Sequence, residues 1–231
     1  MTFAERLRRS QDLYKILEGF DAYTPPREEE SLGGFQSFIN LMSQSNQTVT
    51  SKVQEYRNWT NSRYETFFAG SNAIRQMFYS ISSVVASQYG HRSNEAALVS
   101  TFVNAIRYTR VTKASAEGEN KEDPKSYTLG KQSYATLTKG FHDLVTLING
   151  FEGYKPGNDE FTLENLNTIL AKLNLLNDTV VQRYSDMQDA NRERREIYDE
   201  LKDRVKRIKS YVRSKYGTNS PEYGKIRSMR Y

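Results

Sequence analysis

A regular apolar pattern runs through two stretches of the chain. Steps of three and four residues from Leu32 reach apolar side chains at almost every position, and the same holds from Leu163. The two series are Leu32, Phe35, Ile39, Met42, Asn46, Val49, Val53 and Tyr56, and Leu163, Leu166, Leu170, Leu173, Asn177, Val180, Tyr184 and Met187. A heptad seam of this length is typical of a long helix packed in an antiparallel bundle.

One position of each seam is polar. Asn46 and Asn177 occupy the same place in the two series. A buried asparagine needs a hydrogen-bond partner, and it can fix the register of packed helices at some loss of stability. The alternative is a ligand contact inside the bundle. We favour the register role, because one amide by itself carries no chemistry.

Further helices follow from similar patterns. Apolar steps predict a helix that ends at Tyr89-Gly90 and another that ends at Tyr216-Gly217, where glycine suits a left-handed C-cap. Ser93 and Ser220 come three residues after the glycines, where an N-cap would start the next helix. A helix with Leu98, Phe102 and Ile106 should follow Ser93, and a short terminal turn should follow Ser220. No strand-like alternation extends over a useful length, so the predicted fold class is all-α.

The chain also aligns with itself. A shift of 131 positions pairs residues 2–49 with 133–180, and 12 of these 48 pairs are identical. A shift of 127 pairs residues 74–102 with 201–229, and 8 of these 29 pairs are identical. The difference between the shifts places four extra residues in the first copy, near Phe68-Ala69-Gly70-Ser71.

This alignment predicts two tandem homologous units of three to four helices, related by a pseudo-twofold axis. The first helical repeat covers 1–110 and the second covers 133–231. Between them, residues 111–132 are polar and charged, which is typical of a linker.

Composition narrows the chemistry. The chain of 231 residues has no cysteine and two histidines, which excludes disulfides, thiolate metal sites and a cysteine nucleophile. No nucleotide-binding, zinc-protease or calcium-loop motif is present. We therefore expect no enzyme activity, no cofactor and no metal. The first residues lack the apolar core of a signal peptide, and no segment is apolar enough to span a membrane, so we expect a cytoplasmic protein.

The net charge of +5 is unevenly distributed. Residues 192–231 hold 13 Lys and Arg against six Asp and Glu, a net charge of +7 (13 − 6). A basic stripe can bind phosphate backbones or an anionic surface. The candidate anion-binding face is Lys202, Arg204, Lys206, Arg207, Lys209, Arg213 and Lys215. The alternative, which we favour, is a solvated helix face with ion pairs such as Glu200–Arg204.

Tyrosine is abundant, with 16 residues against 11 Phe and one Trp. Tyrosine is enriched at protein interfaces because its large ring ends in a polar group. Tyr56, Tyr64, Tyr79 and Tyr108 fall on or near helix faces that need not all be core. They can pack at the boundary of the core or contribute to an interface.

The C-terminal segment contains a motif of eight residues that a known protein family shares, namely Tyr211, Val212, Ser214, Gly217, Ser220, Pro221, Tyr223 and Ile226. Tyr216 and Tyr231 stand where the family has phenylalanine. In these positions the chain resembles an uncharacterised bacterial family of tandemly duplicated helical-bundle proteins. The chain departs from the family pattern in a shortened loop near Tyr198-Asp199, where the resemblance implies a turn. The resemblance implies a duplicated helical bundle and transfers no functional residue.

Two functions remain. We expect a non-enzymatic helical scaffold or protein-interaction protein, which binds a protein partner or a second copy of itself. The alternative is nucleic-acid or anionic-surface binding through the basic C-terminal helix, and nucleic acid is the less favoured partner. A carrier with an apolar cavity between the repeats is a third hypothesis that no sequence feature supports.

Overall fold

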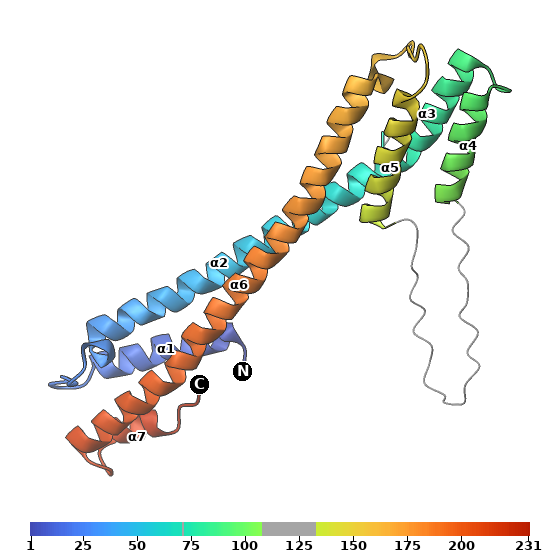
Figure 1. Cartoon of the computed structure of the whole chain (residues 1–231). Helices are drawn as coiled ribbons and strands as arrows, with labels where there is room; N and C mark the ends of the chain where they lie inside the picture. The colour runs from blue at the N-terminus through green and yellow to red at the C-terminus, as the bar shows by residue number, and fades with distance from the viewer. Residues whose placement is uncertain (71, 108–132) are drawn as a thin grey trace, which may run out of the picture. The chain divides into compact units, whose positions relative to one another are not determined.

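The computed structural model describes residues 1–70, 72–107 and 133–231 (Figure 1). These residues form helices and connecting turns with no strand, so the all-α prediction is confirmed. The α-helices are α1 (Phe3–Glu18), α2 (Leu32–Tyr64), α3 (Ile74–Tyr89), α4 (Asn94–Arg107), α5 (Tyr134–Asn149), α6 (Leu163–Tyr216) and α7 (Pro221–Arg227). Shorter helical turns are η1 (Glu28–Glu30), the π-helical η2 (Glu65–Ala69) and η3 (Asp159–Phe161). The predicted linker, residues 111–132, lies outside the described residues.

Local sequence explains where several helices begin and end. The Ser93 and Ser220 hydroxyls accept hydrogen bonds from backbone N–H groups three residues later, at 3.0 and 3.1 Å. These contacts satisfy donors that the first turn of a helix leaves unpaired. Gly90 and Gly217 have φ of 93° and 100°, the left-handed conformation expected of C-cap glycines. The predicted helix ends at Tyr89 and Tyr216 are therefore confirmed.

The chain folds into two compact units. Unit 1 consists of Met1–Arg57 and Arg183–Tyr231, and unit 2 consists of Asn58–Gln182. Each unit therefore combines segments of both predicted repeats, 1–110 and 133–231. The predicted repeats and the compact units therefore have different bounds.

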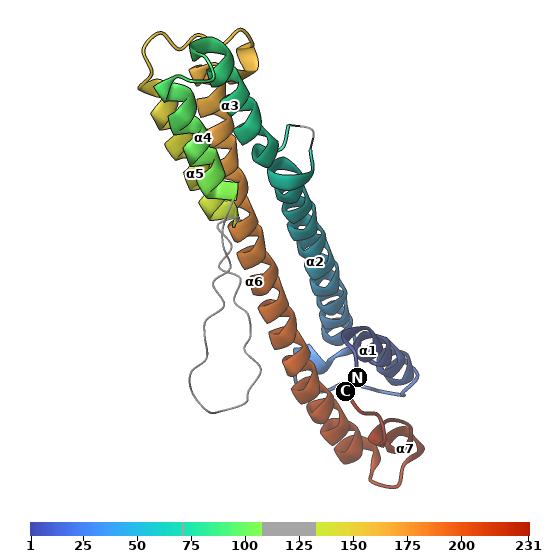
Figure 2. The ribbon, with the colours of Figure 1, turned by 90° about the vertical axis from the view of Figure 1, so that its right-hand side faces the viewer.

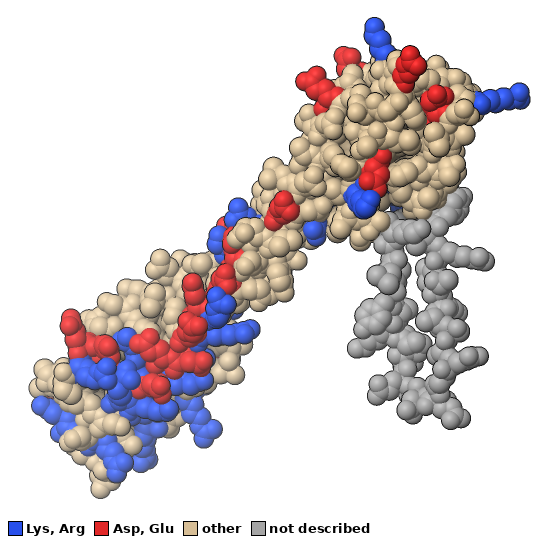
Figure 3. Space-filling view, in the orientation of Figure 1, with Lys and Arg blue, Asp and Glu red and all other residues tan. Residues whose placement is uncertain are grey.

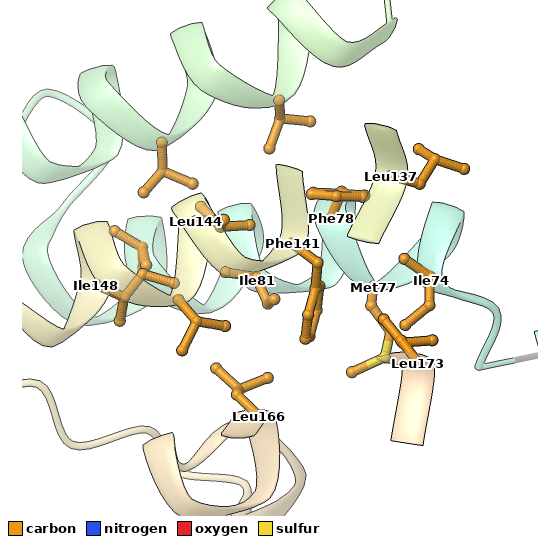
Figure 4. Close-up of a cluster of buried hydrophobic side chains, with 14 of the residues drawn as sticks. Ile74, Met77, Phe78, Ile81, Leu137, Phe141, Leu144, Ile148, Leu166 and Leu173 are labelled. Atoms are coloured by element: carbon orange, nitrogen blue, oxygen red, sulfur yellow. The ribbon is translucent and has the colours of Figure 1, made fainter. Parts of the chain in front are cut away.

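In unit 2, α3, α4 and α5 lie side by side and pack against the first part of α6 (Figures 1 and 2). Ile81, Phe141, Leu144 and Leu166 are fully buried where α3, α5 and α6 meet (Figure 4). The Phe78 and Phe141 rings meet edge to face, with centroids 6.0 Å apart. Burial of side chains of this size contributes about 1.5–3 kcal/mol each, so this cluster holds the unit together.

In unit 1, α1 and the beginning of α2 pack against the C-terminal part of α6 and against α7. Leu17 of α1, Phe35 of α2, Tyr198 of α6 and Ile226 of α7 are all fully buried. The C-terminal helix α7 is short, as predicted, and is anchored to this core through Ile226.

Residues that the self-alignment pairs make corresponding contacts in the two units. The Tyr23 hydroxyl donates to the Glu30 carbonyl in unit 1, and the Tyr154 hydroxyl donates to the Phe161 carbonyl in unit 2, both at 2.9 Å. Tyr154 lies 131 positions after Tyr23, and Phe161 lies 131 positions after Glu30. Burial raises the pKa of Tyr154 to about 12 and also raises the pKa of Tyr23.

A second pair of corresponding contacts joins helix ends to loops. The Tyr216 hydroxyl donates to the Asp21 carbonyl at 2.7 Å, and the Tyr89 hydroxyl donates to the Glu152 carbonyl at 3.0 Å. Tyr216 lies 127 positions after Tyr89, and Glu152 lies 131 positions after Asp21. The contacts thus follow both shifts of the alignment.

The family pattern led us to expect a turn near Tyr198-Asp199, and this expectation is wrong. Helix α6 continues through these residues for 54 positions. In the segment that the self-alignment pairs with this part of α6, the path is interrupted by η2 and by Gly70, whose N–H donates to the Glu65 carbonyl. Residues 163–216 align without a counterpart of Phe68-Ala69-Gly70-Ser71 and contain neither glycine nor proline, so nothing breaks the helix.

Candidate functional site

The predicted basic face lies on the C-terminal part of α6, in unit 1. Lys202 and Lys206 are exposed, and each pairs with a carboxylate of the preceding turn. The distances are 2.8 Å from Lys202 to Asp199 and 2.9 Å from Lys206 to Asp203. These hydrogen bonds lower the pKa of both aspartates. Exposed pairs of this kind contribute little stability, but they offset the positive charge locally.

Two arginines of this face turn inward. The Arg204 guanidinium lies over the Phe38 ring, 4.2 Å from its centroid, and donates to the Glu29 carbonyl at 2.9 Å. Arg207 Nε donates to a Glu30 carboxylate oxygen at 2.6 Å. The side chain of Glu30 is only 4% exposed, so Arg207 neutralises a nearly buried charge. Both arginines hold η1 against α6, and this structural work occupies the groups that would bind an anion.

The last three residues of the face, Lys209, Arg213 and Lys215, lie near the C-terminal end of α6. Lys209 donates to the carbonyls of Arg227 and Met229, which ties the end of the chain to α6. Arg213 and Lys215 are exposed in the last turn of α6. Cations in this position interact favourably with the helix dipole. Of the seven predicted residues, five therefore contact acidic side chains or carbonyls of unit 1.

Figure 3 shows the resulting charge pattern on one face of unit 1, where Lys and Arg side chains gather toward the end of α6 and Asp and Glu side chains lie beside them. Arg194 lies over the Phe3 ring at 4.2 Å, and Arg192 pairs with Asp189 at 2.7 Å. The face is therefore basic in sum but mixed in detail.

A different surface stands out on α4. A groove of about 740 Å³ is lined by one face of this helix and by Leu147 of α5. The α4 residues in the groove are Asn94, Ala97, Leu98, Thr101, Phe102 and Ala105. None of them is charged, and their spacing of three and four residues places them on one helix face.

The other face of α4 packs into the core of unit 2. Val99 and Val103 are 0% and 5% exposed, whereas Leu98 is 52% exposed. The predicted apolar face Leu98–Phe102–Ile106 is therefore only partly the core face. Helix α4 is apolar on two sides, and one of them is open to solvent. Sequence periodicity missed this, because it cannot tell a covered apolar face from an uncovered one.

The tyrosines predicted for core boundaries or an interface differ in their ring contacts and in their exposure. Tyr56 contacts the Tyr184 ring at 5.6 Å, and Tyr64, which is 54% exposed, contacts Phe68 at 5.7 Å. Tyr79 is 36% exposed, and Tyr108 lies outside the described residues. Tyr56 belongs to unit 1, whereas Tyr64 and Tyr79 belong to unit 2.

Both seam asparagines have hydrogen-bond partners, as predicted. Asn46 Nδ2 donates to the Tyr198 hydroxyl at 2.8 Å, and Asn177 Nδ2 donates to the Thr138 hydroxyl at 3.0 Å. The Oδ1 atoms of both asparagines are buried and have no hydrogen-bond partner among the residues that the structure describes. Each amide therefore fixes its neighbour in space, which is compatible with the predicted register role.

The described residues contain no group of three or more His, Asp or Glu side chains that could hold a metal ion. None of the helices in this part of the chain is long and apolar enough to cross a membrane.

Comparison of the chain with protein families, curated proteins and solved structures finds no match. The resemblance to a bacterial family of duplicated helical proteins stays a prediction. Function must therefore be argued from the surfaces themselves.

Proposed function

We propose that this chain is a non-enzymatic protein-interaction protein, and that the groove on α4 is its binding surface. The observation that carries the proposal is the exposed apolar face of α4. Leu98 stands half exposed beside Phe102 and Ala105, with no charged side chain in the groove. An apolar face of this kind is typical of a helix that packs against another protein.

A second part of the proposal concerns the internal duplication of the chain. We propose that residues 1–110 and 133–231 are homologous repeats related by a pseudo-twofold axis. The corresponding contacts of Tyr23 and Tyr154, and of Tyr89 and Tyr216, support this relation. A scaffold function is compatible with such an architecture, because the corresponding contacts hold loops and helix ends in place in each unit.

The occupant that we test first is a second copy of the chain. A groove without charged side chains can face its own copy without repulsion, as an isologous dimer requires. Light scattering should then give about twice the 26.7 kDa of one chain, and the mass should persist from about 50 mM to about 500 mM salt. Apolar contacts are not screened by salt, whereas electrostatic association would weaken.

Leu98→Glu tests the groove directly, since a carboxylate at the centre of an apolar contact must be desolvated. We expect association to weaken at least about tenfold. Leu175→Glu is the matched control, because Leu175 is 65% exposed on α6 of unit 2 and lies outside the groove. The proposal fails if the wild-type chain stays monomeric and no protein partner binds it in a manner that Leu98→Glu weakens.

Binding of nucleic acid or an anionic surface remains the alternative. Arg213 and Lys215 are its best candidates, because they are exposed and no carboxylate in the described part of the chain pairs with them as Asp199 and Asp203 pair with Lys202 and Lys206. Gel-shift titrations at low salt test this alternative, since phosphate binding is strongest there. The absence of a shift would remove it.

A further inference from the structure

Unit 2 contains a pocket of about 380 Å³ between α3 and the beginning of α6. Its floor is apolar, because Ile74, Met77 and Leu173 are at most 8% exposed. Glu160 and Phe161 of η3 form one side. A volume near 400 Å³ lies within the range of small-molecule and side-chain pockets.

The corresponding place in unit 1 is filled by the protein's own arginines. Arg204 corresponds to Met77 and Arg207 to Ser80, each 127 positions earlier. In unit 1 the Arg204 guanidinium covers Phe38 and donates to the Glu29 carbonyl, and Arg207 lies 3.7 Å from the Glu29 carboxylate. The shorter side chains of Met77 and Ser80 leave this space open in unit 2.

A second difference also opens the pocket. In unit 1, η1 approaches α2 so closely that a Cβ atom on Gly34 would overlap the Glu28 carbonyl. The corresponding residue in unit 2 is Asn165, whose amide donates to the Asp159 carbonyl at 2.6 Å. Asp159 corresponds to Glu28. A side chain therefore stands between the loop and the helix in unit 2, where unit 1 has direct contact.

We propose that this pocket of unit 2 binds a guanidinium group, supplied by an arginine side chain or by a small arginine-like molecule. Unit 1 provides the template for the bound group. Of its acceptors, Glu29 is retained as Glu160, and Ile169 takes the place of Phe38 beneath the guanidinium. Glu30 is replaced by Phe161, whose ring offers a face on which a planar cation can stack.

The lining favours a guanidinium over an ammonium ion. Glu160 and Lys172 are the charged side chains of the lining, so they offset one another and no net field attracts a cation. Recognition then depends on directed hydrogen bonds and stacking, which suit the planar, weakly hydrated guanidinium. The aliphatic stem of an arginine would lie along Ile74 and Met77, as long cationic side chains do on apolar surfaces.

Titration of the isotope-labelled full chain with agmatine, followed by two-dimensional NMR, tests the proposal. We expect amide shifts confined to the pocket and a dissociation constant of about 0.1 to 1 mM. N-acetylarginine methylamide, a blocked arginine, should bind at the same residues. Tighter binding of this probe indicates a peptide source, and tighter binding of agmatine indicates a small molecule. The corresponding lysine compound should bind at least about fivefold more weakly.

Two variants and a control locate the site. Glu160→Gln should weaken agmatine binding about fivefold or more, because a charge-assisted hydrogen bond becomes a neutral one. Ser80→Arg restores the residue type of unit 1 and should abolish binding by filling the pocket. Glu164→Gln is the control, since Glu164 lies in the first turn of α6 outside the pocket, and it should change nothing. Thermal melts verify that each variant is folded.

The inference rests on the contacts of the two units and not on the α4 groove. Leu98→Glu should therefore leave agmatine binding unchanged, so the two proposals can fail separately. Absence of pocket shifts at about 10 mM agmatine would overturn the inference. Equal binding of the lysine compound, or unchanged binding by Ser80→Arg, would overturn it as well.

Discussion

The ion pair between Arg207 and Glu30 makes unit 1 sensitive to a specific perturbation. Replacing Arg207 with Met removes the donor that lies 2.6 Å from a carboxylate whose side chain is 4% exposed. Arg27 remains 3.6 Å from the same carboxylate, but it is 56% exposed and replaces the contact only in part. Leaving a buried charge without its partner should lower the free energy of unfolding by about 2–3 kcal/mol.

The reverse change should matter less. Glu30→Met removes the buried charge itself, and the remaining Arg207 is 35% exposed and lies 3.7 Å from Glu29. Water and Glu29 can therefore satisfy the guanidinium, and we expect a loss of about 1 kcal/mol. In the double variant no charge is buried, so its loss should also be about 1 kcal/mol. The two changes should then be coupled by about 2–3 kcal/mol.

Urea denaturation followed by circular dichroism measures the four free energies of this cycle. Lys206→Met is the matched control, because its pair with Asp203 is exposed at both ends and its removal should change stability by less than about 0.5 kcal/mol. Additive losses, with a coupling below about 0.5 kcal/mol, would refute the argument that Arg207 neutralises a buried carboxylate.

Three further predictions concern the glycines and tyrosines. Gly34→Ala should lower the melting temperature, because its Cβ would overlap the Glu28 carbonyl. Gly33→Ala meets open space and should raise the free energy of unfolding by about 0.5–1 kcal/mol. Equal melting temperatures for the two variants would contradict the close approach at Gly34. Tyr23→Phe and Tyr154→Phe should each lose about 1 kcal/mol in urea denaturation, and a loss at one site only would argue against corresponding roles. Burial raises the pKa of Tyr154 to about 12, so its neutral hydroxyl contributes fully to the free energy of unfolding below about pH 10. This contribution should decline between about pH 10 and pH 12, by at most about 1.4 kcal/mol per pH unit. Denaturation between pH 9 and 12 checks this, and constant stability would exclude it.

The helical nature of the chain followed directly from its sequence. Burial of Phe35, Met42 and Leu173 agrees with the predicted seams, and the capping residues Ser93 and Ser220 start helices as expected. These features depend on neighbours three or four residues apart, so local periodicity is sufficient to predict them.

The choice of packing partners did not follow from periodicity. Helix α1 shares a core with the end of α6, and α5 shares a core with α3 and α4, although each of these pairs joins residues far apart along the chain. The amphipathic pattern shows that a helix has an apolar face and leaves its partner unspecified. The self-alignment predicts a four-residue difference near Gly70, but it does not show whether the shorter segment forms a turn or, as in α6, a continuous helix.

The availability of the candidate sites could not be predicted from the sequence for a related physical reason. Seven cations within 14 residues suggest an anion-binding face, yet the sequence does not reveal that Arg204 and Arg207 are held by η1, because η1 lies more than 170 positions away. Conversely, the apolar residues of α4 resemble core residues in the sequence, but Leu98 is exposed in the structure. Charge and hydropathy specify what a side chain can bind, but its availability depends on contacts made by distant segments. For this reason the surfaces that we propose as functional are those that no described segment fills or covers: the open face of α4, and the pocket of unit 2 whose counterpart in unit 1 is filled by arginines.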